Sequence, residues 1–298
     1  MSQPFELLIS GLSLGCIYAL IALGFVIVFK ATKVVNFAQA SLVMLGAYLV
    51  ARWHGGLGFA GAVAAAAVAC CVVGALLDIV LLRPLRKRRG GIDALAIMTI
   101  AINILLGTEL MRDVGTDILP TGAPWGSDTL HLLGVTVPQA RVAAAVVALV
   151  LLAIFSAAFR FSDAGVAMRA TAADPATAAL MGIRLGRVAA GSWAVAGVLA
   201  AIGGAFFTSF PAPGVTTSTG LLALTAIPAA VLGGLDSTAG AVAGGLTIGV
   251  ATTFAAGYQD DIAFLGRGLS EVIPYIALFA VLLWRPSGLF GTREATRV

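Results

Sequence analysis

The chain has 298 residues, of which 60% are hydrophobic and only 11% are charged, and its mean hydropathy is +1.03. A water-soluble domain carries roughly 25% charged residues, so this composition excludes a soluble protein and indicates a polytopic membrane protein. The net charge of +4 does not indicate nucleic-acid binding, because the basic residues fall at the ends of apolar segments.

Nine apolar segments are candidates for membrane spans, each of which needs about 20 mostly apolar residues. They are residues 7–29, 36–51, 57–82, 94–111, 139–159, 188–210, 221–235, 238–257 and 271–284. Two of them, 36–51 and 221–235, are short or broken by Gly and Pro, so either could be re-entrant or discontinuous. We therefore expect an all-α transmembrane bundle of eight or nine spans, forming a single domain over residues 1–298, and the 36 glycines predict close helix packing.

The distribution of Lys and Arg predicts the orientation of these spans. Fourteen of the eighteen basic residues fall in four segments, 30–35, 83–93, 160–187 and 285–298. Positively charged loops stay in the cytoplasm, so these segments and the C-terminus are expected there. An outer N-terminus then requires an odd number of crossings, which favours nine spans.

Two amides, Asn36 and Gln39, stand at the start of the short segment 36–51 and are three residues apart. One helix face can hold both. They either cap the helix near water or line a polar path, since an unsatisfied amide in lipid costs several kcal/mol. Asn103, in the middle of 94–111, is a second candidate for the path, and its alternative is a hydrogen bond between helices.

Two acidic residues within apolar segments have basic neighbours. Asp78 precedes Arg83 and the basic segment 83–93, and Glu109 lies beside Arg112. We expect ion pairs near the interface rather than a proton relay at the bilayer centre.

The inner loop 160–187 reads as two short helices outside the membrane. Asp163 can cap the first helix, and Asp174 followed by Pro175 supplies an N-cap acceptor and a first residue without an N–H for the second. Gly182 offers the C-terminal stop. Its exposed side is expected to present Ala178, Leu180 and Met181. The loop is either a well-capped connector or a docking helix for a cytoplasmic partner.

The segment 221–257 contains a proline and many glycines. Pro228 frees a backbone acceptor, and interrupted helices often mark transporter pathways. We therefore assign Pro228, Gly233 and Gly234 to the translocation path. Tight packing is the preferred explanation for Gly240, Gly244 and Gly245.

The sequence offers no motif for catalysis. It lacks a GxxxxGK[ST] phosphate loop, an HExxH pair, a GxSxG turn and a Cys/His cluster. We expect no catalytic residue, no metal ligand and no cofactor on this chain, so energy for uphill transport would have to come from a separate ATPase.

Four stretches, in order along the chain, carry a resemblance to a known family. They are GLSLGCIYALIALGFVIVFKATKVVNFAQASLVMLGAYL, MRATAADPATAALMGIRLGRV, AIPAAVLGGLDSTAGAVAGGLTIGV and LLWRPSGLFG. Together they resemble the ABC importer permeases of the branched-chain amino acid uptake family, and the second resembles their coupling loop. The generic importer loop has Glu-Ala-Ala followed by Gly, whereas Ala172, Ala173 and Asp174 precede Gly182 here.

The resemblance implies a permease subunit in the inner or plasma membrane, driven by ATP and Mg²⁺ on partner chains. Its implied partners are a second related permease, two cytoplasmic ATPase subunits, and a periplasmic or surface solute-binding protein. The implied contacts with the ATPase are Asp174, Pro175, Ala178, Leu180, Met181, Gly182 and Arg184. The implied solutes are Leu, Ile and Val, with urea or short amides as alternatives.

Two other kinds of protein remain to be weighed against the permease. An autonomous secondary carrier or channel would transport its solute without any ATPase. A membrane enzyme would need a nucleophile or metal cluster, which the sequence does not offer.

Overall fold

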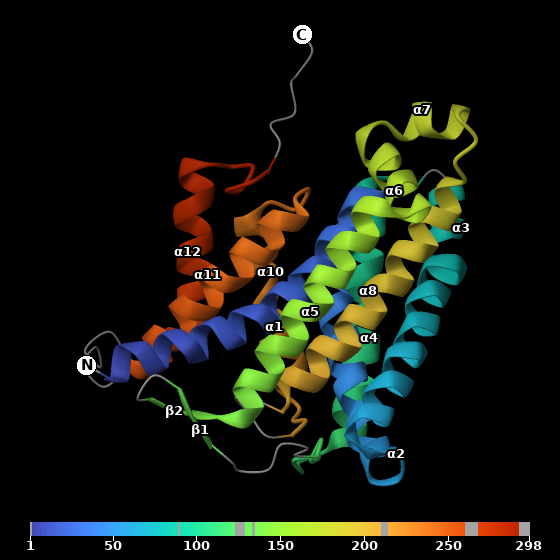
Figure 1. Cartoon of the computed structure of the whole chain (residues 1–298). Coiled ribbons are helices and arrows are strands. Elements are labelled where there is room, and N and C mark those ends of the chain that lie inside the picture. Colours follow the sequence, from blue (N-terminus) through green and yellow to red (C-terminus); the bar gives the residue numbers. More distant parts are fainter. Residues whose placement is uncertain are drawn as a thin grey trace. The chain divides into compact units, whose positions relative to one another are not determined.

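The structure is a computed structural model of the chain, and it describes residues 2–88, 90–122, 129–132, 135–209, 214–259 and 268–291. Within these residues the chain is mostly helical, as expected (Figure 1). The helices are α1 (Ser2–Thr32), α2 (Gln39–Leu76), the π-helical turn η1 (Leu77–Leu82), α3 (Arg83–Lys87), α4 (Ile92–Val114), α5 (Gln139–Phe161), α6 (Asp163–Ala173), α7 (Pro175–Leu180), α8 (Leu185–Phe207), α9 (Thr219–Ala223), α10 (Ala226–Gly233), α11 (Thr238–Gly257) and α12 (Leu269–Trp284). A short hairpin pairs β1 (Thr129–Leu132) with β2 (Val135–Pro138), with Leu132 opposite Val135.

The chain divides into two compact units. Unit 1 comprises Met1–Val26, Trp125–Leu149 and Thr225–Val298, and unit 2 comprises Ile27–Pro124 and Val150–Leu224. The division falls within α1 and within α5. The expectation of one transmembrane domain over residues 1–298 stays a prediction.

Six helical segments of the described residues are long and apolar enough to cross a bilayer, and Thr219–Gly233 and Leu269–Trp284 are shorter apolar helices. The longest segment, Gln39–Lys87, has 49 residues. As one straight helix it would measure about 74 Å at 1.5 Å per residue, whereas the hydrocarbon core is about 30 Å thick. Gly58 interrupts it with φ 67° and ψ 169°, a conformation outside the helical region.

The two halves of α2 run along α8 in opposite directions, which shows that the chain reverses its direction at Gly58. Along the first half, Gln39 lies beside Ala196 and Val43 beside Gly204. Along the second half, Cys70 lies beside Gly197 and Gly74 beside Trp193. Segments 36–51 and 57–82, which were predicted separately from the sequence, are therefore two helices that run antiparallel to each other.

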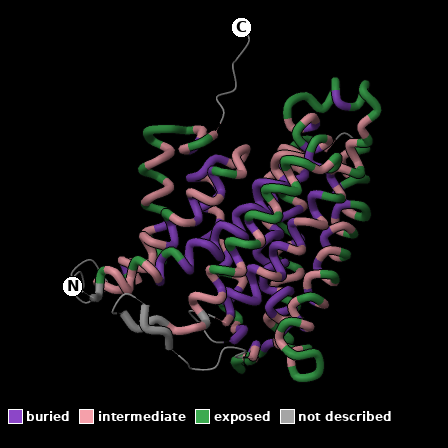
Figure 2. Tube along the Cα trace, viewed as in Figure 1, coloured by how far each residue is buried: buried purple, intermediate pink, exposed green. Residues whose placement is uncertain are grey.

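Small residues allow this close approach of α2 to α8. A Cβ on Gly46 would lie 2.3 Å from the Cα of Ala201, and a Cβ on Gly74 would lie 2.3 Å from the Trp193 carbonyl oxygen. Figure 2 shows the buried residues of unit 2 concentrated along α8 and α2. On α4 the exposed side chains are largely apolar, including Ile97, Ile104 and Leu105, as expected for a face that meets lipid.

In unit 1, α10 and α11 cross at a pair of glycines. A Cβ on Gly233 would lie 2.0 Å from the Gly240 carbonyl oxygen, and the reverse distance is 2.2 Å. After α12, the N–H groups of Leu289 and Phe290 donate to the carbonyls of Leu232 and Gly233, at 2.8 and 3.0 Å. The stretch LLWRPSGLFG thus caps the C-terminal end of α10.

Candidate functional site

A cluster of polar side chains surrounds the start of α2 in unit 2. This amide cluster consists of Asn36, Gln39, Ser41, Thr99 and Asn103. Asn36, Gln39 and Thr99 are completely buried, and Ser41 is nearly so. Burial of so many polar groups is unfavourable unless each finds a partner.

The hydrogen bonds of the two amides form a chain whose direction is fixed. Gln39 Nε2 donates to the Ala196 carbonyl at 3.2 Å, and that carbonyl can only accept. Gln39 therefore turns its Oε1 towards Asn36, whose Nδ2 donates to it at 3.2 Å. Asn36 Oδ1 is left buried, with no donor in the described part of the chain. A buried acceptor without a donor costs about 1–3 kcal/mol, so this oxygen is the strongest candidate in the cluster for a ligand contact.

Side chains of α4 satisfy the first backbone N–H groups around the start of α2. Asn103 Oδ1 accepts from the Ser41 N–H at 3.1 Å, and Thr99 Oγ1 accepts from the Phe37 N–H at 3.3 Å. The hydrogen bond between helices that was one alternative for Asn103 is confirmed. Asn36 and Gln39 do not cap α2 and do not meet water, so that alternative is wrong for both. Thr99 was not predicted from the sequence, although its spacing of four from Asn103 places both residues on one helix face.

The inner loop forms α6 and α7, as predicted, although Asp163 does not cap α6. The cap is Ser162, whose hydroxyl accepts from the Gly165 N–H at 3.1 Å. Asp174 caps α7 and accepts from the Ala176 N–H at 2.9 Å and from the Thr177 hydroxyl. These donors, the Thr177 hydroxyl foremost, lower the pKa of the Asp174 carboxyl from its ordinary value. Gly182 ends this turn with φ 87°, which favours glycine.

The exposed side of α7 differs in part from the prediction. Leu180 and Met181 are 87% and 79% exposed, as expected. Ala178 is only 3% exposed, so its predicted outward orientation is wrong: it lies on the side of the short helix that is covered. Pro175 occupies the first helical position, and Arg184 immediately precedes α8. Figure 1 shows α7 at the end of unit 2 opposite to the turn between the two halves of α2.

The predicted path residues fall in both units. Asn36, Gln39 and Asn103 belong to unit 2, whereas Pro228, Gly233 and Gly234 belong to α10 and its end in unit 1. Contact with Gly240 already explains the glycine at 233, and Gly234 has φ 107° against the backbone of Gly291. Pro228 is buried within α10. The role of these three residues in a path stays a prediction.

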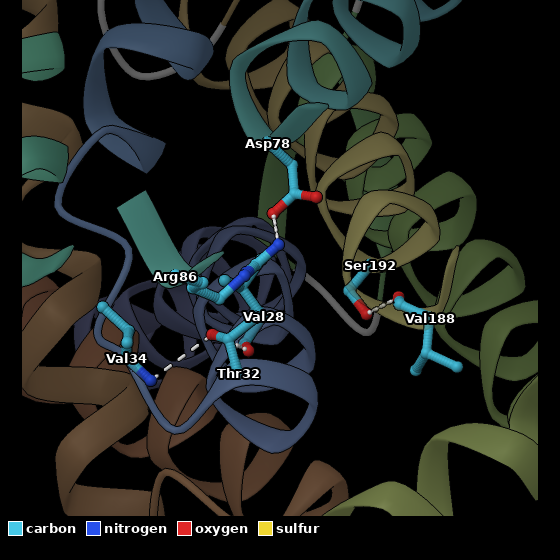
Figure 3. A network of polar contacts seen from close by, with 7 residues as sticks. All are labelled: Val28, Thr32, Val34, Asp78, Arg86, Val188 and Ser192. Carbon is cyan, nitrogen blue, oxygen red and sulfur yellow. Dashed lines mark hydrogen bonds and ion pairs between the residues drawn. The ribbon is translucent and has the colours of Figure 1, made fainter. Parts of the chain in front are cut away.

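A second buried polar contact lies at the basic end of unit 2. Arg86 Nη2 donates to Asp78 Oδ1 at 2.6 Å, and Asp78 stands in the π-helical turn η1 (Figure 3). The predicted ion pair of Asp78 is confirmed, with Arg86 as the partner, and its place near the membrane interface stays a prediction. At the other end of α4, Glu109 and Arg112 form the second expected pair, at 2.7 Å, on an exposed surface.

Comparison with known proteins gives a consistent result over the whole chain. Residues 7–282 match the family described as "branched-chain amino acid transport system / permease component". The permease protein LivH of the high-affinity branched-chain amino acid transport system of Salmonella typhimurium is 31% identical, with 100% of both chains covered. The corresponding BraD of Pseudomonas aeruginosa is 29% identical, covering 98% of this chain and 97% of its own. A probable LivH permease of Methanocaldococcus jannaschii is 29% identical over 91% of this chain and 88% of its own. No solved structure matches the chain.

Proposed function

The chain belongs to the family of branched-chain amino acid transport system permease components, and from this premise we propose that it is the membrane subunit of an ATP-driven importer. Members of this family are transport subunits rather than enzymes, and the ATPase of such importers is a separate chain. The solute, by analogy with the named relatives, is Leu, Ile or Val, with urea and short amides as the alternative class.

One observation carries the coupling part of this proposal. Leu180 and Met181 stand almost fully exposed at the end of a capped two-turn segment outside the spans. Burying an aliphatic side chain of this size on a partner contributes about 1.5–3 kcal/mol. The caps at Asp174 and Gly182 hold the pair in place, so a groove on an ATPase subunit can receive it without first ordering the loop.

The same basic end suggests the orientation. Several basic residues lie at helix ends close to α6 and α7, namely Lys33, Arg83, Lys87 and Arg184. Basic loops face the cytoplasm. We infer that α7 and the C-terminus are cytoplasmic and that the membrane is the inner or plasma membrane. A solute-binding protein would then deliver the solute at the opposite ends of the spans, and a second related permease and two ATPase subunits would complete the importer.

The amide cluster is the proposed polar contact for the solute. An amino acid presents an ammonium group that needs acceptors, and Asn36 Oδ1 is a buried acceptor for which the described residues supply no donor. Because Asn36 and Gln39 are completely buried, the path opens only when α2 and its neighbours move. Different ATPase states would have to bind α7 with different free energies to drive that movement.

Co-purification tests the coupling proposal. Leu180→Lys is compared with Ile118→Lys, which changes an equally apolar side chain that is 63% exposed outside the loop. We expect Leu180→Lys to lower the recovery of the ATPase subunit at least tenfold and Ile118→Lys to leave it unchanged. Equal recovery with both variants would overturn the docking role of α7. Transport tests the rival, since uptake by the reconstituted chain alone would identify an autonomous carrier or channel.

A further inference from the structure

A basic pocket opens at the end of unit 2 where several helices terminate. Its volume is about 470 Å³, and its polar lining consists of Thr32, Lys33, Arg83, Arg86, Lys87 and Thr171. These residues come from three separate parts of the chain: the end of α1, the segment after η1, and α6. The remaining lining is small or apolar and includes Pro175 and Leu185.

The protein balances the positive charges in this basic pocket only in part. Asp78 neutralises Arg86 through their contact at 2.6 Å. Lys33, Arg83 and Lys87 form no ion pair within the described residues, and no acidic side chain lines the pocket. Three positive charges therefore converge on one concave space, which raises the local concentration of anions.

Two features of the backbone position the basic side chains of the pocket: a tight turn at Lys33 and a glycine, Gly186, beside Arg83. Lys33 has φ 57°, the only positive φ of a non-glycine residue in the described part of the chain, and the turn there follows α1 directly. The Thr32 hydroxyl supports the turn by donating to the Val28 carbonyl at 2.8 Å and accepting from the Val34 N–H (Figure 3). On the opposite wall, a Cβ on Gly186 would lie 3.3 Å from Arg83 Nε, so glycine leaves room for the guanidinium.

We propose that this basic pocket binds a phosphate group, either in the headgroup of an anionic phospholipid or in a soluble phosphate compound. Guanidinium and ammonium groups form charge-assisted hydrogen bonds to phosphate oxygens. The candidate spans Pro4–Thr32 and Gln39–Lys87 both end at the pocket, so it lies at the level where lipid headgroups begin. Basic pockets at this level between transmembrane helices bind anionic headgroups.

The position of the pocket gives the bound phosphate a consequence for α7. Thr171 lies near the end of α6 and Pro175 begins α7, and both line the same space as Lys33 and Arg83. A phosphate group there links the ends of the spans to the junction of α6 and α7. Its binding would therefore reduce the mobility of that junction, independently of which solute the protein transports.

The experiment measures lipid retention by native mass spectrometry of the full chain in detergent. Delipidated protein is titrated with phosphatidylglycerol, and separately with phosphatidylcholine as the neutral headgroup. The pocket variant is Arg83→Gln with Lys87→Gln. The matched control, Arg88→Gln with Arg160→Gln, removes the same charge from exposed residues of the same end that do not line the pocket. A competition arm adds glycerol 3-phosphate, and thermal unfolding confirms that each variant is folded.

We expect phosphatidylglycerol to bind more tightly than phosphatidylcholine. The pocket variant should lose affinity about 25-fold, from roughly a fivefold loss for each of its two charges, and the control should lose much less. Competition by millimolar glycerol 3-phosphate would identify a soluble phosphate compound as an occupant, and its absence would identify the lipid headgroup. Equal losses in the two variants would show a diffuse surface field and overturn the site, as would equal binding of the two lipids. If the pocket variant unfolds, Lys33→Gln against Arg88→Gln gives the same comparison with one charge each.

Discussion

The Asp78 carboxylate and the Arg86 guanidinium lie 2.6 Å apart, with the Asp78 side chain completely buried and that of Arg86 25% exposed. The pair joins the π-helical turn η1 to α3, and the second carboxylate oxygen of Asp78 has no hydrogen-bond partner in the described part of the chain. Such a carboxylate depends on nearby cations, since a buried charge without a partner is strongly unfavourable, and Arg83 adds a smaller electrostatic contribution to that of Arg86. Arg86 also lines the basic pocket, so it serves Asp78 and the pocket at once.

The first prediction concerns this ion pair. Arg86→Gln leaves the buried carboxylate without its hydrogen-bonded cation and is expected to destabilise the protein by about 3–5 kcal/mol. Adding Asp78→Asn removes the charge and should restore most of that loss. Thermal unfolding of the purified variants in detergent measures both effects. A double variant as unstable as Arg86→Gln alone would contradict the electrostatic explanation.

A second prediction sets two glycine-to-alanine changes against each other. At Gly46 the new Cβ would lie 2.3 Å from the Ala201 Cα, so α2 and α8 must separate, and we expect a loss of about 1–3 kcal/mol. At Gly107, within α4, a Cβ meets nothing within 4 Å. There Ala should stabilise the helix by about 0.5–1 kcal/mol. The same unfolding assay would disprove the packing argument if both changes had the same sign.

The third prediction separates a transport role of Asn36 from a structural one. Asn36→Leu removes the donor to Gln39 Oε1 and the acceptor Oδ1, and we expect at least a tenfold loss of leucine uptake while the importer still assembles. Ser192→Ala is the matched control, because it removes a buried hydroxyl that bonds to the Val188 carbonyl within α8, outside the amide cluster. If the two variants lost uptake in proportion to their loss of thermal stability, Asn36 would be a structural residue.

The sequence predicted the helical class and most segment positions because the length of an apolar segment is a local signal. It also predicted the caps at Asp174 and the stop at Gly182, which depend on two or three neighbouring residues. The buried side of α7 could not be predicted, since a helix of six residues has too little periodicity to place Ala178. The N-cap of α6 could not be predicted either, because Ser162 and Asp163 are adjacent and both residue types are good N-caps.

Contacts over long sequence separations account for what the sequence did not reveal in the candidate sites. The amide cluster depends on contacts of Gln39 with Ala196 and of Ser41 with Asn103. These residues are far apart in the sequence, so no local pattern predicts the contacts. The π-helical turn η1 lies inside an apolar segment whose periodicity reads as an ordinary helix. Similarly, the basic pocket combines Lys33 and Arg83 with Thr171, and the orientation argument had already accounted for the two charged residues.

The fourth prediction concerns the pH dependence of α7. The pKa of Asp174 is lowered from its ordinary 3.8 by the Thr177 hydroxyl and by the Thr177 and Ala176 N–H groups, which bond to the ionised carboxylate. A lowered pKa in the folded state means that this stabilisation is complete above the ordinary value and is lost as the pH falls through the lowered one. Amide hydrogen exchange of residues 176–181, corrected for the intrinsic rate, should therefore be slow at pH 5 to 7 and rise below about pH 4. Asp174→Asn, which keeps an N-cap acceptor, should stay protected without that rise, and Asp174→Ala should exchange several-fold faster at every pH. The same acid-induced rise in Asp174→Asn would show that another group controls the opening of α7.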